Sequence, residues 1–129
     1  MSKILVNIKT RDIPVILNVV NVKHIKQDHT SIDKSDHIIE CEGETSNTNI
    51  VEGFLDWLNQ TLELTTKEEI PLEYKTDAIL CYPKDNRYKL VSGCYVYKFR
   101  TYFSTSSRDI LMKVSFICKS PTTFNDSSI

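Results

Sequence analysis

Residues 88–118 read YKLVSGCYVYKFRTYFSTSSRDILMKVSFIC, and this stretch decides the fold class of the chain. It is dense in tyrosine, phenylalanine and β-branched residues, which fit the pleated, half-buried surface of a sheet. Gly93 and a polar run divide it into segments of strand length. It therefore predicts three strands, over residues 87–93, 94–103 and 110–118.

The last of these strands has two different faces, because successive side chains of a strand point to opposite sides. One face is wholly apolar and predicts core: Ile110, Met112, Val114, Phe116 and Cys118. The other is mixed: Leu111, Lys113, Ser115 and Ile117. Alternation divides the preceding strand into Tyr95, Tyr97, Phe99 and Phe103 on one face and Val96, Lys98, Arg100 and Tyr102 on the other.

A mixed face suits either an ordinary surface or a surface that a partner covers, since single exposed aliphatics are common. The sequence favours the partner-covered sheet slightly. The candidate subunit-interface residues are therefore Val96, Lys98, Arg100, Tyr102, Leu111, Lys113 and Ile117.

The rest of the chain predicts further strands and a single helix. β-branched runs indicate strands over 4–8, 13–25, 37–43 and 71–83. Residues 49–64 carry an amphipathic stripe and a capping-box start at Asn49 and Glu52, which predict the helix. Gly53 inside it indicates a close approach by another segment. The fold class is mainly β, an antiparallel sandwich or barrel of about seven strands with one helix. We expect one domain over 1–119 and a loosely ordered polar tail over 120–129.

Composition excludes several classes of protein. The chain has 129 residues, 40% hydrophobic and 26% charged, as expected for one soluble globular domain. It has no apolar run of membrane-spanning length, and its first residues lack a secretory pattern. Its four cysteines form no C-x-x-C pair, so they are expected to be reduced and mostly buried.

Charge is strongly segregated along the chain. The net charge is +4 over residues 1–27, −10 over 28–83 and +6 over 84–119, within a total of −1. Such blocks suit complementary faces, within one fold or between copies.

Candidate chemistry is sparse. The interleaved Tyr95, Tyr97, Lys98, Phe99 and Arg100 could stack bases and hold phosphates, but the RNA-recognition order of residues is broken here. The three histidines and the acidic run near residues 28–44 match no metal-ligand spacing. No nucleotide-binding or hydrolase motif occurs. We expect no cofactor, no metal and no enzymatic activity.

Three features resemble the tail tube proteins of contractile phages and the related tube proteins of type VI secretion. They are the helix segment FLDWLN at 54–59, the element Leu90-Val91-Ser92-Gly93-Cys94-Tyr95, and the long final strand after Ser106-Ser107-Arg108-Asp109-Ile110. The resemblance covers residues 37–118.

The resemblance implies a structural virion subunit, made in the host cytoplasm and placed in a phage-type tail. Such subunits form hexameric rings in which strands of each copy join a continuous inner barrel. The rings stack head-to-tail as a conduit for DNA, with sheath and baseplate proteins as other partners and no membrane. We expect Lys98, Arg100 and Lys113 to face neighbouring subunits more than the channel, and the polar segment 27–36 to contact the next ring.

Two other functions stay open from the residues alone. One is a small nucleic-acid-binding β module. The other is a monomeric phage accessory or inhibitor protein that occludes a host partner.

Overall fold

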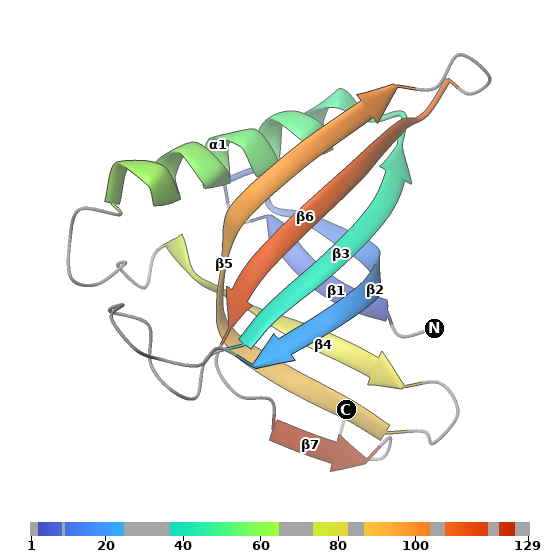
Figure 1. Cartoon of the computed structure of the whole chain (residues 1–129), viewed down its shortest axis with the longest axis vertical. Helices are drawn as coiled ribbons and strands as arrows, with labels where there is room; N and C mark the ends of the chain where they lie inside the picture. Colours follow the sequence, from blue (N-terminus) through green and yellow to red (C-terminus); the bar gives the residue numbers. More distant parts are fainter. Residues whose placement is uncertain are drawn as a thin grey trace.

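The computed structural model describes residues 3–8, 10–24, 37–64, 74–82, 87–103, 108–118 and 122–125. Within them lie seven strands and one helix (Figure 1). Their bounds are β1 (Lys3–Ile8), β2 (Ile13–His24), β3 (His37–Thr45), α1 (Thr48–Leu64), β4 (Thr76–Tyr82), β5 (Arg87–Phe103), β6 (Ile110–Cys118) and β7 (Thr122–Asn125).

Six of the strands close into an antiparallel barrel. The order is β4-β1-β2-β3-β6-β5, and a further pairing between β4 and β5 completes the circuit. β7 pairs with the first part of β5. The predicted mainly β fold with about seven strands and one helix is confirmed.

β5 is one continuous strand, where the sequence predicts two. Gly93 lies within it with φ 65°, a left-handed conformation that glycine adopts without a Cβ clash. At this point β5 changes partners. Up to Cys94 it pairs with β4, and from Tyr95 it pairs with β6. The strand therefore bends between two parts of the barrel wall instead of ending.

A β-bulge in β5 changes the face on which its side chains lie. The register with β6 shifts between Val96 and Lys98. Because a bulge adds one residue, both Val96 and Phe99 point inward, and they are 0% and 9% exposed. The prediction that Val96 shares a face with Lys98, and Tyr97 with Phe99, is wrong for this reason.

The core fills the barrel and continues under the helix. On β6, Met112, Val114, Phe116 and Cys118 of the predicted apolar face are buried, and Ile110 at its start is half-buried. Phe54 of α1 meets Phe99 and Phe116 with ring centroids 5.4 and 6.2 Å apart. The helix thus closes the wall beside β5, and its aromatic side chains form part of the barrel core.

The start of α1 and the glycine inside it each have a structural explanation. The first turn is capped by Asn47, whose Oδ1 accepts a hydrogen bond of 3.0 Å from the backbone N–H of Asn49. The cap is therefore two residues earlier than the predicted one. A Cβ on Gly53 would lie 2.9 Å from Cγ2 of Ile8, so the close approach expected at this glycine is confirmed.

Several sequence expectations concern the termini and loops. Residues 122–125, placed in the polar tail, form β7. Cys41, Cys94 and Cys118 are buried, as predicted. The segment 27–36 lies outside the described residues. Among the described residues, no helix has the length and apolar character needed to cross a membrane.

Candidate assembly interface

The second part of β5 has a strand on one side only. β6 pairs with β5 from Tyr95 to Phe103, whereas β4 pairs with it no further than Cys94. On the other side of Val96–Phe103, no described strand pairs with β5. Alternate N–H and C=O groups of a strand point to each side, so this side is a strand edge free of pairing among the described residues, and α1 packs beside β5.

β2 has a matching free edge at its second half. Among the described residues, β1 pairs with β2 as far as Asn18, which lies opposite Lys3, the first residue that the structure describes. Beyond that point β3 is the sole partner of β2 among the described strands, up to His24. The segment Val19–His24 is therefore the second free edge.

These two edges border the same sheet, formed by the second half of β2, by β3, by β6 and by the second half of β5 (Figure 1). All three pairings within it are antiparallel. A sheet of four antiparallel strands has edge strands that run in opposite directions. If two copies lie in the same orientation, the β5 edge of one copy meets the β2 edge of the next as an antiparallel neighbour.

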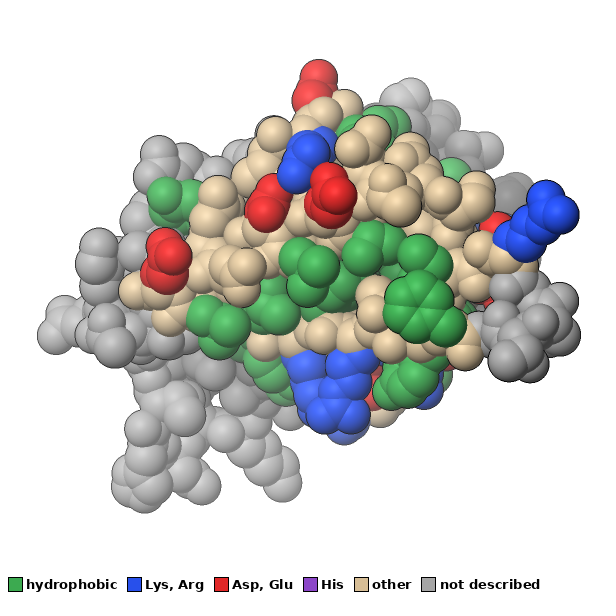
Figure 2. All heavy atoms as spheres, turned by 90° about the horizontal axis from the view of Figure 1, so that it is seen from above, with side chains coloured by type: hydrophobic (Ala, Val, Ile, Leu, Met, Phe, Trp, Pro, Cys, Tyr) green, Lys and Arg blue, Asp and Glu red, His purple; other side chains and the backbone are tan. Residues whose placement is uncertain are grey.

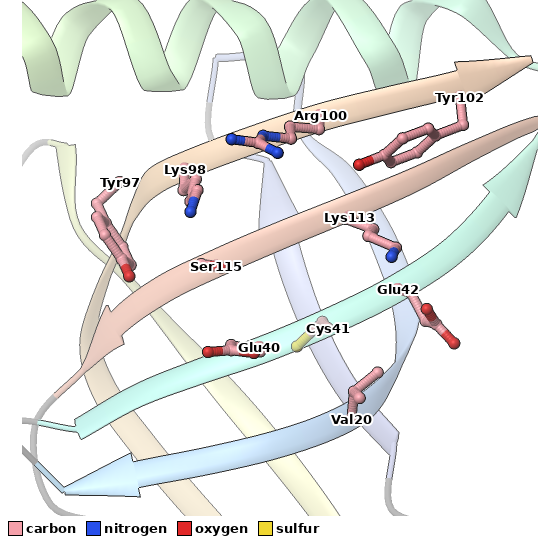
Figure 3. A pocket seen from close by; sticks show the side chains of 10 residues that line it. All are labelled: Val20, Glu40, Cys41, Glu42, Tyr97, Lys98, Arg100, Tyr102, Lys113 and Ser115. Carbon is pink, nitrogen blue, oxygen red and sulfur yellow. The ribbon is translucent and has the colours of Figure 1, made fainter.

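The outward face of this sheet carries two rails of opposite charge. Glu40, Glu42 and Glu44 alternate along β3 with the buried Ile39 and Cys41. In cross-strand register, Glu42 lies beside Lys113 of β6, which lies beside Arg100 of β5. Lys98 continues the basic rail (Figure 3).

Several charged side chains on this face contact neighbouring side chains. Lys23 Nζ lies 2.8 Å from Glu40 Oε1, and this hydrogen bond raises the pKa of Lys23. Lys113 Nζ lies 5.3 Å from the ring centroid of Tyr102, a cation–π contact.

Between the rails is a hollow of about 270 Å³, open to solvent on the outer side. Its lining carries both signs of charge, so it suits no ion of a single sign.

The predicted interface residues fall into three groups. Lys98, Arg100 and Tyr102 point outward from β5, the strand that has a free edge. Leu111 and Lys113 lie one strand further in, on β6. Val96 and Ile117 are 0% and 6% exposed within a single copy, so their side chains are already covered by this chain.

Sequence reasoning missed a second kind of surface, made of exposed aliphatic side chains. Leu55 and Leu62 of α1 are 43% and 52% exposed. Figure 2, which looks onto the side where α1 lies, shows an apolar band between charged borders. The helical spacing puts Leu62 almost opposite Gly53, and Gly53 faces β1. Since α1 packs against β5 and β1, the leucine flank borders β5. The helix pattern carried the signal, because Leu62 belongs to its apolar stripe and Leu55 lies beside that stripe.

Of the other exposed aliphatics, Leu5, Ile16 and Leu90 form a row with the half-buried Ile79 across the outside of the barrel, whereas Val20 and Val22 lie on the second half of β2. Ile16 of β2 pairs with Leu5 of β1, which pairs with Ile79 of β4, which pairs with Leu90 of β5. Ile16 is 65% exposed and Leu5 is 38% exposed. This outer row became visible only with the strand register.

The described residues also bear on a metal site and on nucleic-acid binding. They contain no group of three or more His, Cys, Asp or Glu side chains placed to hold a metal ion. The set suggested for stacking bases is divided, because Phe99 is in the core while Lys98 and Arg100 are exposed. The acidic rail on the same face opposes binding to phosphates.

No protein-family model and no curated protein matches the chain. Solved structures do. One is a chain of the PVC sheath–tube complex of an extracellular contractile injection system in the extended state, with 9% identity, a TM-score of 0.53, and coverage of 96% of this chain and 88% of that one. Another is a chain of the sheath/tube terminator of the same system, with 10% identity, a TM-score of 0.51, and coverage of 95% and 92%.

A third match is the tube-terminating cap of the anti-feeding prophage, with 10% identity, a TM-score of 0.50, and coverage of 95% of this chain and 87% of that one. At such low identity these likenesses establish the fold. The chain therefore has a tail-tube-like fold, and its structural neighbours are components of contractile injection systems.

Proposed function

We propose that this chain is a non-enzymatic structural subunit of a phage-type tail, most directly of the tail tube. It acts by forming hexameric rings that stack head-to-tail into a conduit for DNA, in a particle assembled in the host cytoplasm. The observation that carries this proposal is the pair of free edges on the four-stranded sheet. One edge is Val96–Phe103 and the other is Val19–His24.

Two edges of opposite direction on opposite sides of one sheet support a heterologous contact. Each copy offers its β5 edge to one neighbour and its β2 edge to the other, so the contact propagates until the ring closes. A closed ring covers both of these edges, which removes the aggregation hazard that they carry. The likeness to injection-system components agrees with this arrangement.

Within the ring, Lys98, Arg100 and Tyr102 lie at the boundary between copies because they are on the edge strand itself. Leu111 and Lys113 support that boundary from β6. Val96 and Ile117 leave the proposed interface because their own chain buries them. In this ring the outward face lines the channel, so Lys98, Arg100 and Lys113 point into it beside the glutamates of β3. This replaces the expectation that these three side chains face neighbouring subunits more than the channel. The glutamates keep the lining from being strongly basic, so DNA can pass without sticking.

The first experiment is negative-stain electron microscopy of the purified protein at neutral pH, together with size-exclusion chromatography. The proposal expects rings or short tubes. A sharp monomer peak at high protein concentration would overturn it and favour the accessory-protein function. Salt-sensitive binding to single-stranded DNA without rings would favour the nucleic-acid module.

A matched pair of proline variants tests the β5 edge itself. In an antiparallel ladder, neighbouring residues point their N–H groups to opposite sides, so one of Thr101→Pro and Tyr102→Pro removes an N–H facing β6 and the other removes one facing the free edge. We expect the edge-facing variant to fold and fail to assemble, and the other to lose stability. Tyr102→Ala is the control for the loss of the tyrosine side chain alone.

A further inference from the structure

Two exposed apolar surfaces of the chain have no role in the strand pairing described so far. The first is the helix flank, where Leu55 and Leu62 are 43% and 52% exposed; Val51 and Leu58 beside them are partly buried against the core. The second is the outer row, Ile16, Leu5, Ile79 and Leu90, which crosses four strands. They lie on different parts of the surface, so one copy cannot bury them against each other.

We propose that the helix flank of one copy packs on the Leu5–Ile16 end of the outer row of the next copy. This inference rests on the proposed ring, and it names the apolar contact that supports the strand pairing. The occupant of each surface is a second copy of this chain. Every copy uses its helix flank towards one neighbour and its outer row towards the other.

The helix flank is continuous with the β5 edge. Gly53 and Asp56 lie on the side of α1 that faces β1 and Arg11, since Arg11 Nη2 is 2.9 Å from Asp56 Oδ2. The leucine flank is on the other side and borders β5. Figure 2 shows basic side chains along one border of the apolar band, and red and blue side chains together along the other. A strand added to the β5 edge therefore brings its own copy against the helix flank.

The outer row is continuous with the β2 edge. The free segment Val19–His24 begins beyond the last pair of β1 and β2 in the described residues, Lys3 and Asn18. The barrel wall that adjoins this edge is the pair β1 and β2, and its outward side chains include Leu5 and Ile16, which are cross-strand partners. A copy whose β2 docks on a neighbouring β5 turns this part of its wall towards that neighbour, where α1 lies.

The contact between copies must also be large enough for a stable interface. A stable interface buries about 800 Å² on each partner, which pairing of two six- to eight-residue strand edges supplies only in part. Apolar side chains beside the paired edges provide the remainder, with a fully desolvated centre where binding energy concentrates. Ile16 at 65% exposure and Leu62 at 52% leave a large apolar area in water in a single copy. Their burial favours the ring over the free chain.

Variants that introduce a charge test the contact, because both side chains are exposed in a single copy and folding should be preserved. We expect Leu62→Asp and Ile16→Asp each to weaken assembly at least tenfold, measured as the concentration at which rings form. The double variant Leu62→Lys with Ile16→Asp should recover much of the assembly, since every junction then pairs Lys with Asp. Gln60→Asp, on the opposite flank of α1, is the matched control and should assemble like the unchanged chain.

Circular-dichroism melting confirms that all variants fold. Unimpaired rings from Leu62→Asp or Ile16→Asp would overturn this inference and leave the ring proposal standing. Loss in both single variants without recovery in the double variant would also overturn the pairing of these two surfaces. Absence of rings in the unchanged chain is a different result, because it overturns the proposed function.

Discussion

The indole N–H of Trp57 donates a hydrogen bond of 2.7 Å to the backbone carbonyl of Tyr74. This bond ties the middle of α1 to the chain segment that leads into β4. Trp57 is 3% exposed, and its ring centroid lies 5.8 Å from that of Phe116. One side chain therefore joins the helix, the barrel core and the entry to β4.

Trp57→Phe should reduce the free energy of unfolding by about 2–4 kcal/mol, because it leaves the Tyr74 carbonyl without its donor and creates a small void. Urea unfolding followed by circular dichroism measures the change. Asn59→Ala, an exposed position of the same helix, serves as control and should stay within about 0.5 kcal/mol. A Trp57→Phe variant as stable as that control would contradict the role given to the hydrogen bond.

Gly53→Ala should destabilise the fold by about 1–3 kcal/mol, although alanine is the better helix former by about 1 kcal/mol. The reason is the new Cβ, which would lie 2.9 Å from Ile8 Cγ2 and 3.1 Å from Arg11 Cγ. A double-mutant cycle with Ile8→Ala checks the cause, since Gly53→Ala should cost less once the Ile8 side chain is shortened. If the two changes are simply additive, the clash with Ile8 is not the cause.

Cys41 should make stability fall at high pH. Burial raises the pKa of its thiol to about 12 in the folded chain, from 9.0. Below pH 9 the thiol is protonated in both states and contributes no pH dependence. Between pH 9 and 12 the unfolded chain loses the proton and the folded chain keeps it, so up to about 1.4 kcal/mol per pH unit is lost.

The measurement compares the unchanged chain with Cys41→Ala in urea at several pH values. Other titrating groups cancel in the difference between the two proteins. The advantage of the unchanged chain should therefore shrink above pH 9. An advantage that stays constant from pH 8 to pH 10.5 would show that the Cys41 thiol ionises as freely as in the unfolded chain.

Arg11→Ala should have a small effect on stability, of about 0.5–1 kcal/mol, because its two ion pairs with Glu52 and Asp56 are largely exposed. The loss should decrease further at high salt, which screens surface charges. Thermal unfolding at two salt concentrations tests this. A loss of several kcal/mol that salt does not change would indicate that Arg11 acts through packing against Gly53.

Local pattern was enough to predict most of the strands, the helix and the core face of β6. These features depend on neighbouring residues, and the alternation of Met112, Val114 and Phe116 carries through to the barrel without interruption. The helix position was predicted within a residue, but its cap was not. Asn47 caps it because the side-chain oxygen reaches the N–H of Asn49, and the sequence offered Asn49 as an equally good candidate.

The candidate interface was only partly predictable. Alternation placed Val96 beside Lys98 on the outside, and the bulge between them reversed that assignment for Val96. A bulge depends on the register with β6, which local sequence does not encode. The free edges of β5 and β2 likewise depend on where β4 and β1 stop pairing, a property of the whole barrel.

The central claim is that the β5 edge of one copy pairs with the β2 edge of the next. A cryo-electron-microscopy reconstruction of the assembled protein tests it most directly. The account predicts Val96–Phe103 of each copy beside Val19–His24 of its neighbour, antiparallel and within hydrogen-bonding distance. A reconstruction in which these two edges lie apart, with copies joined through other surfaces, would contradict it.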